Sequence, residues 1–275
     1  METKISVLTL VKGRHAALLN LVKGLSLNST AAIELIVVHM NEEPCTLPLV
    51  AFPVRSLSLY TDEQLPLAKA RNLAVSSANA EYCIFLDVDC IPAANFISLY
   101  QQAFRDKDIL WSGAVRYLRD GFPEDLEPLQ LEKWSDPDPV RGNLPSLSYE
   151  LFWSLNFGCS KNIFYKIGQF DEGYGGYGAE DTDFSFSARK QGIPLRSLPA
   201  VAYHQPHAGY DPPLNHLEDI VKNARVFHAK WQRWPMEGWL KKFQLLGYVS
   251  WTEDELSVGS IPAPAELEKY LKKTA

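Results

Sequence analysis

The feature that most constrains the fold is an apolar run that ends abruptly in two carboxylates. The run is Tyr82-Cys83-Ile84-Phe85-Leu86, and Asp87 and Asp89 follow it with one residue between them. A continuous run of this kind is typical of a strand that is buried on both faces of an α/β sheet. Ligands of such sheets bind just beyond the carboxyl ends of the strands. We therefore expect Asp87 and Asp89 at a ligand site, although the Asp-x-Asp tripeptide also occurs in simple turns.

The first half of the chain alternates between strand-like and helix-like segments. Apolar runs predict the strands, and apolar residues at helical spacing predict the helices. The expected strands are 5–11, 33–40, 54–59 and 82–86, and the expected helices are 15–27 and 67–77. This alternation predicts an α/β fold with a mostly parallel, doubly wound sheet that is flanked by helices.

The second half has a less regular pattern. We expect helices at 94–104 and 179–190, strands at 109–115 and 200–203, an ordered segment at 155–160, and mainly helices in the tail. The segment 120–146 is acidic and rich in proline, which breaks regular structure. A segment of this length and composition is either a functional flap or a disordered insertion. We predict a flexible insertion there.

Composition and charge exclude some classes of protein. The net charge of −6 argues against a general nucleic-acid binder, which is usually basic. No apolar stretch is long enough for a membrane span, and the N-terminus lacks the layout of a signal peptide, so the expected location is cytoplasmic. The four cysteines, Cys45, Cys83, Cys90 and Cys159, lack Cys-x-x-Cys spacing. They therefore indicate free thiols in a reducing compartment rather than a zinc or disulfide framework.

A second group of carboxylates lies about ninety residues downstream. Glu180, Asp181 and Asp183 open the expected helix at 179–190 and follow the glycine-dense run 168–178. Acids are favoured at a helix start by the helix dipole alone. However, glycines let the backbone approach a ligand closely, and a carboxylate beside such a loop can serve as a general base.

Taken in order, these motifs resemble those of family 2 glycosyltransferases with the GT-A fold, in particular members with a galactosyltransferase-like C-terminal motif. The resemblance covers most of residues 5–205. It rests on the strand 5–11 with Arg14, on Leu67-Ala68-Lys69-Ala70-Arg71-Asn72, on Phe85-Leu86-Asp87-Val88-Asp89, on the segment 156–172, and on Gly175-Gly176-Tyr177-Gly178-Ala179-Glu180-Asp181-Thr182-Asp183.

The resemblance implies a function and a division into domains. The function is a metal-dependent, inverting transfer of a hexose or N-acetylhexosamine from a nucleotide diphosphate sugar, with UDP the expected nucleotide, to a hydroxyl of a saccharide or lipid-linked acceptor. Residues 1–210 would form the GT-A catalytic domain, with a nucleotide-sugar-binding half (1–115) and an acceptor and catalytic half (147–210). The insertion 120–146 separates these halves, and 211–275 would be a helical C-terminal extension.

The resemblance also implies a Mn²⁺ or Mg²⁺ site. Negative charge builds up on the diphosphate as the sugar departs, and a bound divalent metal neutralises it as a Lewis acid. We expect Asp89 to be the direct ligand and Asp87 to reach the ribose or a metal-bound water. His204, after the expected strand 200–203, is the expected third ligand, with His207 a weaker alternative to it. The alternative for both histidines is a plain surface position.

The resemblance assigns the general base to the Glu-Asp pair. We expect Asp181 to take the proton from the acceptor hydroxyl and Glu180 to bind hydroxyls of the acceptor or donor. The opposite assignment stays open, because the two residues are adjacent.

Further residues are expected to contact the substrates. The expected contacts to the donor nucleotide and its diphosphate are Thr9, Arg14, Lys69 and Arg71, and those to the sugar or acceptor are Trp153, Asn156, Gly176 and Tyr177. Each charged residue could instead be a solvated surface charge, and each residue of the second set could be part of the core. Two departures from the family pattern affect specificity. The second strand ends in His39-Met40-Asn41 where the family often has an Asp-rich, base-reading end, and Tyr177 stands where the motif usually has Trp.

The segment 222–243 combines six basic residues with interleaved aromatic ones. It either packs as a helical appendage on the catalytic domain, which we favour, or makes a peripheral contact with an anionic membrane at its inner face. Two other functions remain open for the chain as a whole: a nucleotidyltransferase, and a non-catalytic sugar-nucleotide-binding scaffold on the same fold.

Overall fold

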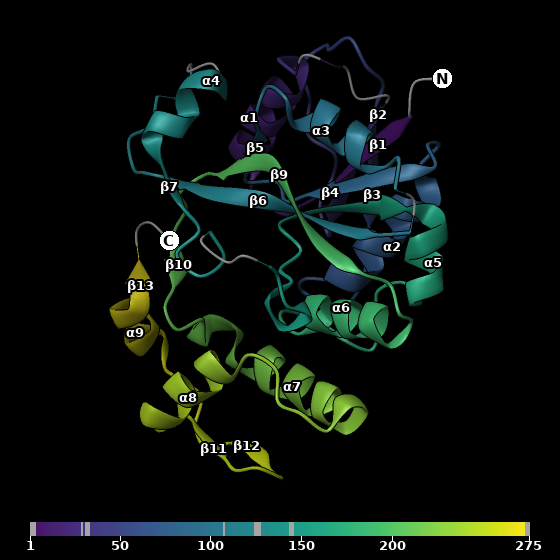
Figure 1. The fold of residues 1–275 in the computed structure, drawn as a ribbon. Coiled ribbons are helices and arrows are strands. Elements are labelled where there is room, and N and C mark those ends of the chain that lie inside the picture. Colours follow the sequence, from purple (N-terminus) through teal and green to yellow (C-terminus); the bar gives the residue numbers. More distant parts are fainter. Residues whose placement is uncertain are drawn as a thin grey trace.

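The computed structural model describes residues 4–272 except 29, 31–33, 107, 124–127 and 143–145. A curled, mixed β-sheet forms the centre, and helices cover both of its faces. A smaller C-terminal part lies beyond the helices on one of these faces (Figure 1). The strands of this sheet run in the order β3-β2-β1-β4-β8-β6-β9-β5, and β7 pairs with β6 at the side.

The bounds of the elements follow the order of the chain. The strands are β1 (Ile5–Val11), β2 (Glu34–Met40), β3 (Val54–Leu59), β4 (Tyr82–Leu86), β5 (Cys90–Pro92), β6 (Leu110–Leu118), β7 (Ser135–Pro137), β8 (Asn156–Ser160), β9 (Leu195–His204), β10 (Gly209–Tyr210), β11 (Val249–Trp251), β12 (Leu256–Val258) and β13 (Leu271–Lys272). The helices are α1 (His15–Ser26), α2 (Leu67–Ser77), α3 (Phe96–Ala103), α4 (Pro128–Leu131), α5 (Lys161–Ile167), α6 (Glu180–Lys190), α7 (Leu217–Trp231), α8 (Glu237–Leu245) and α9 (Pro264–Leu267).

The first half of the sheet confirms the α/β prediction. Strands β3, β2, β1 and β4 pair in parallel, and α1 and α2 connect strands of this group. Side chains of β4 alternate between two apolar clusters: Ile84 and Leu86 enter one, while Cys83 and Phe85 enter the other. A strand whose two faces are both buried needs apolar residues at every position, which explains the unbroken apolar run.

The second half of the sheet is mixed rather than parallel. Strand β8 is antiparallel to both β4 and β6, β9 is parallel to β6, and β5 is antiparallel to β9. The strand β5 was not expected from the sequence, because three residues are too few to show a periodicity. The helix α5 and the strand β7 were not expected either.

Helices cover the sheet from both sides, and each side has its own apolar core. Helices α1 and α3 pack on one face, with Leu21 and Tyr100 fully buried. Helices α2, α5 and α6 pack on the other face around a stack of phenylalanines, in which Phe170 and Phe184 lie with ring centroids 4.4 Å apart. Aromatic pairs in such offset stacks add to the stabilisation from burial.

The predicted insertion 120–146 lies partly outside the described residues. Its described part contains α4 and the strand β7, which pairs with the end of β6. Arg116 on β6 donates from Nε to Ser135 Oγ at 2.8 Å and supports this pairing. These described residues are therefore held against the sheet.

The C-terminal part is helical as expected, but it also contains two short hairpin-like pairings. Strand β11 pairs with β12, and β13 returns to pair with β10, so that the two ends of the segment after 209 lie together. Helices α7 and α8 pack around their own apolar cluster, which includes Ile220 and Phe243. In Figure 1, α7 and α8 lie on the far side of α6 from the sheet.

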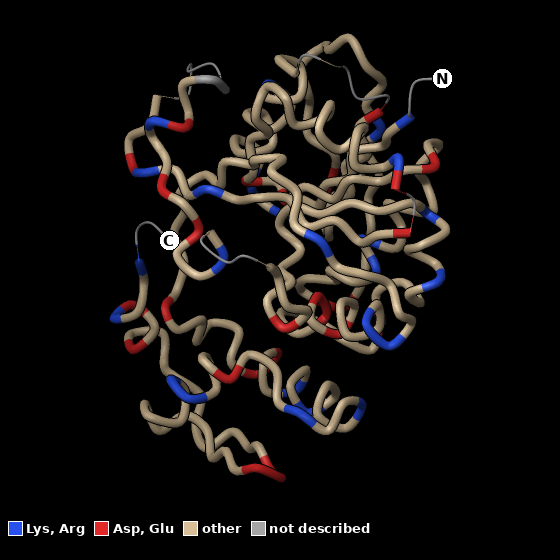
Figure 2. Tube along the Cα trace, in the orientation of Figure 1, with Lys and Arg blue, Asp and Glu red and all other residues tan. Residues whose placement is uncertain are grey.

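The basic and aromatic residues of 222–243 make internal contacts. Lys230 Nζ lies 2.9 Å from Asp183 Oδ2, and Trp231 Nε1 donates to Asp183 Oδ1 at 2.7 Å. Arg225 donates to the Leu256 carbonyl, and Phe227 is buried. In both helices the acidic residues lie at the start and the basic residues follow (Figure 2). The contacts agree with an appendage that packs on the catalytic domain, while the peripheral membrane contact stays an untested prediction.

Asn156 ties three neighbouring strands together. Its side chain extends from β8 across Gly113 of β6, where an added Cβ would lie 2.2 Å from Asn156 Nδ2. The amide donates to the carbonyls of Ala114 at 3.0 Å and Ala200 at 2.9 Å, and its oxygen accepts from the Tyr100 hydroxyl at 2.8 Å. The β6–β9 register shifts just beyond Gly113. The Asn156 amide therefore supplies hydrogen bonds where the regular pairing of these two strands is interrupted.

We predict that Asn156→Ala lowers the free energy of unfolding by about 3 kcal/mol, because two strand carbonyls lose their donors in a desolvated place. Urea denaturation followed by circular dichroism measures this change. The matched control is Asn162→Ala on the exposed side of α5, for which we expect a change near zero. Equal effects of the two variants would contradict the role of Asn156 in the ladder.

Candidate functional site

The antiparallel pairing of β5 with β9 brings Asp89 and His204 together. Cys90 lies opposite His204 in this pairing, and the backbone N–H of Gln205 donates to the Asp89 carbonyl at 2.7 Å. Asp89 immediately precedes β5, and His204 ends β9. Residues 115 positions apart in the sequence therefore become neighbours through main-chain hydrogen bonds.

Asp89, His204 and His207 form a compact group of potential metal ligands. Their ligand-capable atoms all lie within 4.8 Å of one another. His204 Nε2 lies 3.5 Å from Asp89 Oδ1, and His207 Nε2 lies 3.5 Å from Asp89 Oδ2. His207, the weaker alternative at the sequence level, is thus placed as close to the carboxylate as His204.

The donor set fits a divalent transition-metal ion. One oxygen of Asp89 (Oδ1), which lies 3.5 Å from His204 Nε2, is buried without a hydrogen-bond partner among the described residues. Buried polar atoms of this kind normally have a partner, which a bound ion or its water can supply. Imidazole ligands suit Mn²⁺ and the later transition metals better than Mg²⁺, which prefers oxygen. Burial lowers the pKa of His204, which favours the neutral ring that a metal requires.

Arg14 donates its guanidinium to the same carboxylate. Its Nη1 donates to Asp89 Oδ2, and its Nη2 lies 3.3 Å from His207 Nδ1. Arg14 stands just before α1, and its side chain is 38% exposed. The guanidinium thus supplies positive charge at the place where we expect a metal ion. An anionic ligand that bound there would lie within hydrogen-bonding reach of Arg14.

The second acidic group begins helix α6, and its two members have different surroundings. Glu180 is buried and accepts from Arg71 Nη1 at 2.9 Å, and both side chains are only 6% exposed. Asp181 is partly exposed, and its Oδ1 accepts from the backbone N–H of Thr182 at 2.7 Å. Arg71 also donates to Ser154 Oγ at 2.7 Å and lies over the Phe170 ring. Glu180 is thus fixed by Arg71, whereas Asp181 has a freer carboxyl group.

The two acidic groups lie close enough to influence each other electrostatically. Burial and the Asp89 carboxylate raise the pKa of Asp87 to about 7, with a further upward effect of Glu180 and an opposing one of Arg71. Burial and the Glu180 carboxylate raise the pKa of Asp181 to about 7, again against the effect of Arg71. A group with a pKa near neutral can take up and release a proton at physiological pH.

A strained glycine loop precedes α6 and sets the position of this acidic pair. Gly176 and Gly178 have φ values of +77° and +99°, and Ala179, at the N-cap of α6, has a φ of +70°. A non-glycine residue in this region is uncommon and costs free energy unless the surroundings enforce it. Asn223 of α7 enforces it, because its buried amide nitrogen lies 3.0, 3.3 and 2.9 Å from the carbonyls of Gly175, Tyr177 and Gly178.

Asn223 was missed by sequence reasoning. It lies in the segment after 211, which we had treated as an appendage, and no motif marks it. Its position on a helix with a buried apolar stripe gave a weak signal, because a buried amide among apolar residues must have partners. The C-terminal part therefore helps to shape the loop that holds Glu180 and Asp181.

Gly176 and Tyr177 lie at the junction of the glycine loop with the C-terminal part. An added Cβ at Gly176 would lie 2.3 Å from the Asp219 carboxyl, so only glycine fits there. The Tyr177 ring stacks on His216 with centroids 4.5 Å apart. Burial raises the pKa of Tyr177, and Glu180 and Asp181 raise it further, which places its hydroxyl near the acidic pair.

The other predicted contact residues differ in how free their side chains are. The Thr9 hydroxyl is buried and has no hydrogen-bond partner in the part of the chain that the structure describes, and Lys69 pairs with Glu63 at 2.6 Å. Trp153 is partly buried, and the Arg141 guanidinium lies 4.3 Å from its ring centroid. Asn156 uses its amide and its carbonyl oxygen in the sheet, as described above. The substrate contacts of these residues stay predictions.

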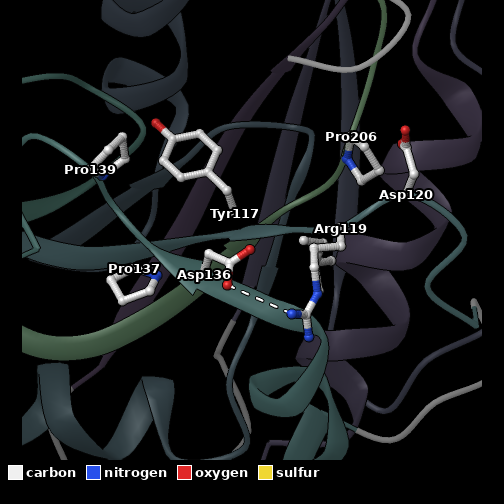
Figure 3. A pocket seen from close by; sticks show the side chains of 8 residues that line it. Tyr117, Arg119, Asp120, Asp136, Pro137, Pro139 and Pro206 are labelled. Atoms are coloured by element: carbon white, nitrogen blue, oxygen red, sulfur yellow. Dashed lines mark ion pairs between the residues drawn. The ribbon is translucent and has the colours of Figure 1, made fainter.

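A surface hollow of about 530 Å³ adjoins the group of potential metal ligands. Figure 3 shows Tyr117, Pro206 and the ion pair of Arg119 with Asp136 among the side chains that line it. The Tyr117 ring lies 5.1 Å from the His204 ring, and Pro206 directly precedes His207. The hollow thus leads from the insertion 120–146 to the histidines.

Within the described part of the chain, no helix combines the length and the apolar composition that a membrane crossing requires.

The sequence matches no protein-family model and no curated protein. The fold is similar to solved structures. The structure of GalNAc-T7 with UDP, GalNAc and Mn²⁺ aligns with a TM-score of 0.56 and 14% identity over 74% of this chain and 44% of that chain. Residues 1–349 of Staphylococcus aureus TarS in complex with UDP align with a TM-score of 0.54 and 14% identity over 82% of this chain and 66% of that chain.

These similarities confirm the fold and leave the activity to be argued from the site. Both neighbours are glycosyltransferases with the GT-A fold, and the present chain spans less than two thirds of either of them. At 14% identity, the similarity to these two structures supports the fold and does not identify a particular family. The chain has the GT-A fold.

We predict that Arg14→Ala tightens the binding of Mn²⁺ in the absence of nucleotide by about fivefold. The guanidinium competes with a metal ion for Asp89, and a partly exposed ion pair is worth about 1 kcal/mol. Titration with Mn²⁺ followed by electron paramagnetic resonance measures the free ion. Arg196→Ala, which removes an exposed arginine elsewhere, is the control. Weaker Mn²⁺ binding in Arg14→Ala would refute the competition.

Proposed function

We propose that this protein is a metal-dependent, inverting glycosyltransferase that moves a hexose or N-acetylhexosamine from a UDP-sugar to a hydroxyl of a saccharide or lipid-linked acceptor. The observation that carries the proposal is the arrangement of two acidic groups on the GT-A fold. Asp89 lies with two histidines in the first group, and Asp181, which has a raised pKa, belongs with Glu180 to the second group. UDP is bound in the structures of both GalNAc-T7 and TarS that are similar to this chain.

The residues near Asp89 would hold the donor. Asp89, His204 and His207 are the proposed ligands of Mn²⁺, which as a Lewis acid stabilises the charge that develops on the leaving diphosphate. Asp87 would contact the ribose or a metal-bound water. Arg14 would contact the diphosphate once the metal ion has replaced it on Asp89, because it already lies within reach of the ligand group.

Asp181 would be the general base. Its carboxyl group is partly exposed, and a pKa of about 7 lets it accept the proton of the acceptor hydroxyl near neutral pH. Glu180 would position hydroxyl groups with its second oxygen, since Oε1 is held by Arg71, while Oε2 is buried and finds no partner among the residues that the structure describes. A direct attack of the acceptor on the anomeric carbon inverts the configuration there.

The two alternative functions have weaker support. A nucleotidyltransferase usually has a glycine-rich basic loop after the first strand, and here the Lys12 ammonium donates to the Gln64 carbonyl at 2.6 Å. A non-catalytic scaffold has no need of a carboxyl group with a near-neutral pKa beside a potential metal centre. Sugar-nucleotide cleavage separates all three functions.

We predict that Asp181→Asn lowers the turnover of the donor by about 10²–10⁴-fold, because an amide cannot accept the proton. The measurement is cleavage of a panel of UDP-sugars with Mn²⁺. Binding of UDP with Mn²⁺, followed as a rise of the melting temperature, should stay within the range of the unchanged protein.

The matched control is Asp254→Asn in the exposed turn between β11 and β12, which should leave turnover and UDP binding unchanged. Near-normal turnover in Asp181→Asn, together with a large loss in Glu180→Gln, would exchange the roles of the two residues. If the protein neither binds nor cleaves any nucleotide sugar, that result would contradict the proposed function as a whole.

We predict that kcat falls on the acid side with an apparent pKa of about 7. The active form of the base is the carboxylate, and its raised pKa means that protonation begins near neutrality rather than near pH 4. The rate should therefore be flat above about pH 8 and fall roughly tenfold for each pH unit below about 6. The pH profile at saturating donor and Mn²⁺ tests this. A rate that stays flat down to about pH 5 would place the base elsewhere.

A further inference from the structure

A second group of metal-binding side chains lies at the end of β2, outside the site described above. Ligand-capable atoms of His15, His39 and Cys45 all lie within 4.8 Å of one another. His15 is the first residue of α1, His39 lies next to the end of β2, and Cys45 belongs to the irregular segment 41–53 between β2 and β3. Three separate segments of the chain thus meet at this point.

Glu42 lies beside two of these side chains, His15 and His39, and offers a carboxylate as a fourth potential ligand. Its Oε1 lies 3.1 Å from His15 Nε2 and 3.4 Å from His39 Nδ1. Tetrahedral zinc sites have bonds of about 2.0–2.1 Å to nitrogen and oxygen, so neighbouring ligand atoms are about 3.3 Å apart. The distance between His15 Nε2 and Glu42 Oε1 therefore matches an edge of such a tetrahedron. Because His39 Nδ1 faces Glu42, the nitrogen that His39 can offer to an ion is Nε2.

His39 has a buried ring nitrogen that lacks a partner. The side chain is completely buried, and its Nε2 has no hydrogen-bond partner among the described residues. A buried polar atom without a partner normally indicates a missing ligand.

We propose that His15, His39, Glu42 and Cys45 form a binding site for a thiophilic divalent ion, with Zn²⁺ the best fit. A thiolate and a carboxylate balance the two charges of the ion, and two neutral imidazoles complete the shell. Thiolate and imidazole ligands select zinc, whereas the group around Asp89 has no sulfur and suits Mn²⁺. The two sites would thus hold different metals.

The proposed ion would fasten the loop that carries Arg14. Glu42 Oε2 already accepts from the backbone N–H of Gly13 at 2.7 Å, and His15 follows Arg14 directly. An ion bound to these ligands would join the start of α1 to the segment 41–53, which contains no helix or strand. Because these ligands come together only in the folded chain, the free energy of binding the ion would stabilise the folded state.

Cobalt titration tests the proposed site independently of any enzymatic activity. Co²⁺ replaces Zn²⁺ in tetrahedral sites, and a thiolate ligand gives it an intense charge-transfer absorption in the near ultraviolet. We expect this band to appear with one equivalent of Co²⁺ in the unchanged protein, and to disappear when Zn²⁺ is added. Cys45→Ser should lose the band, and its affinity for Zn²⁺ should fall by about 100-fold or more.

Asp89→Asn is the matched control, because it alters the other group of ligands and should keep the band. The remaining cysteines, Cys83, Cys90 and Cys159, are buried, so they stay as internal thiols in every variant. The proposed site is overturned if the unchanged protein gives no band, or if Cys45→Ser keeps it. A melting temperature of metal-free Cys45→Ser close to that of the metal-free unchanged protein confirms that the loss is one of binding and not of folding.

Discussion

The site depends on one buried ion pair, that of Arg71 with Glu180. The two side chains lie 109 residues apart in the sequence and join α2 to α6. Both are almost fully buried. The guanidinium also donates to Ser154 Oγ and lies over the Phe170 ring. Removing one partner of such a pair leaves a buried charge and costs about 3–5 kcal/mol. The pair also distinguishes two adjacent acids, because it holds Glu180, whereas Asp181 accepts hydrogen bonds from Thr182.

Main-chain hydrogen bonding supplies the second constraint. The three-residue strand β5 returns the chain next to β9 directly after the Asp-x-Asp motif, and its register sets Asp89 beside His204. Asn156 and Gly113 fix the neighbouring part of the same sheet. The ligand group is therefore built on paired strands and not on a loop alone, which favours a constant geometry.

The sequence predicted most of the fold because its elements are long or strongly patterned. Helix α2 and the strands β1, β3 and β4 begin and end where the apolar pattern indicates. The short strands β5 and β7 were missed, since three residues show no period. The group of His15, His39 and Cys45 was missed as well, because its members come from three segments without the spacing of a zinc motif. Asn223 was missed because a single polar residue on an amphipathic helix has no distinguishing pattern.

The sequence by itself determined the α/β class, the buried strand that ends in Asp87 and Asp89, and the acidic start of α6. These features are local, and each follows from the period and the chemistry of a few consecutive residues. Only the tertiary structure decided that Arg71 pairs with Glu180 and not with Asp181. It also decided that His207 lies with His204 at Asp89, and that a side chain of α7 holds the glycine loop. Such properties depend on burial and on contacts between distant segments, because desolvation and neighbouring charges set the state of an ionisable group and its position in the sequence does not.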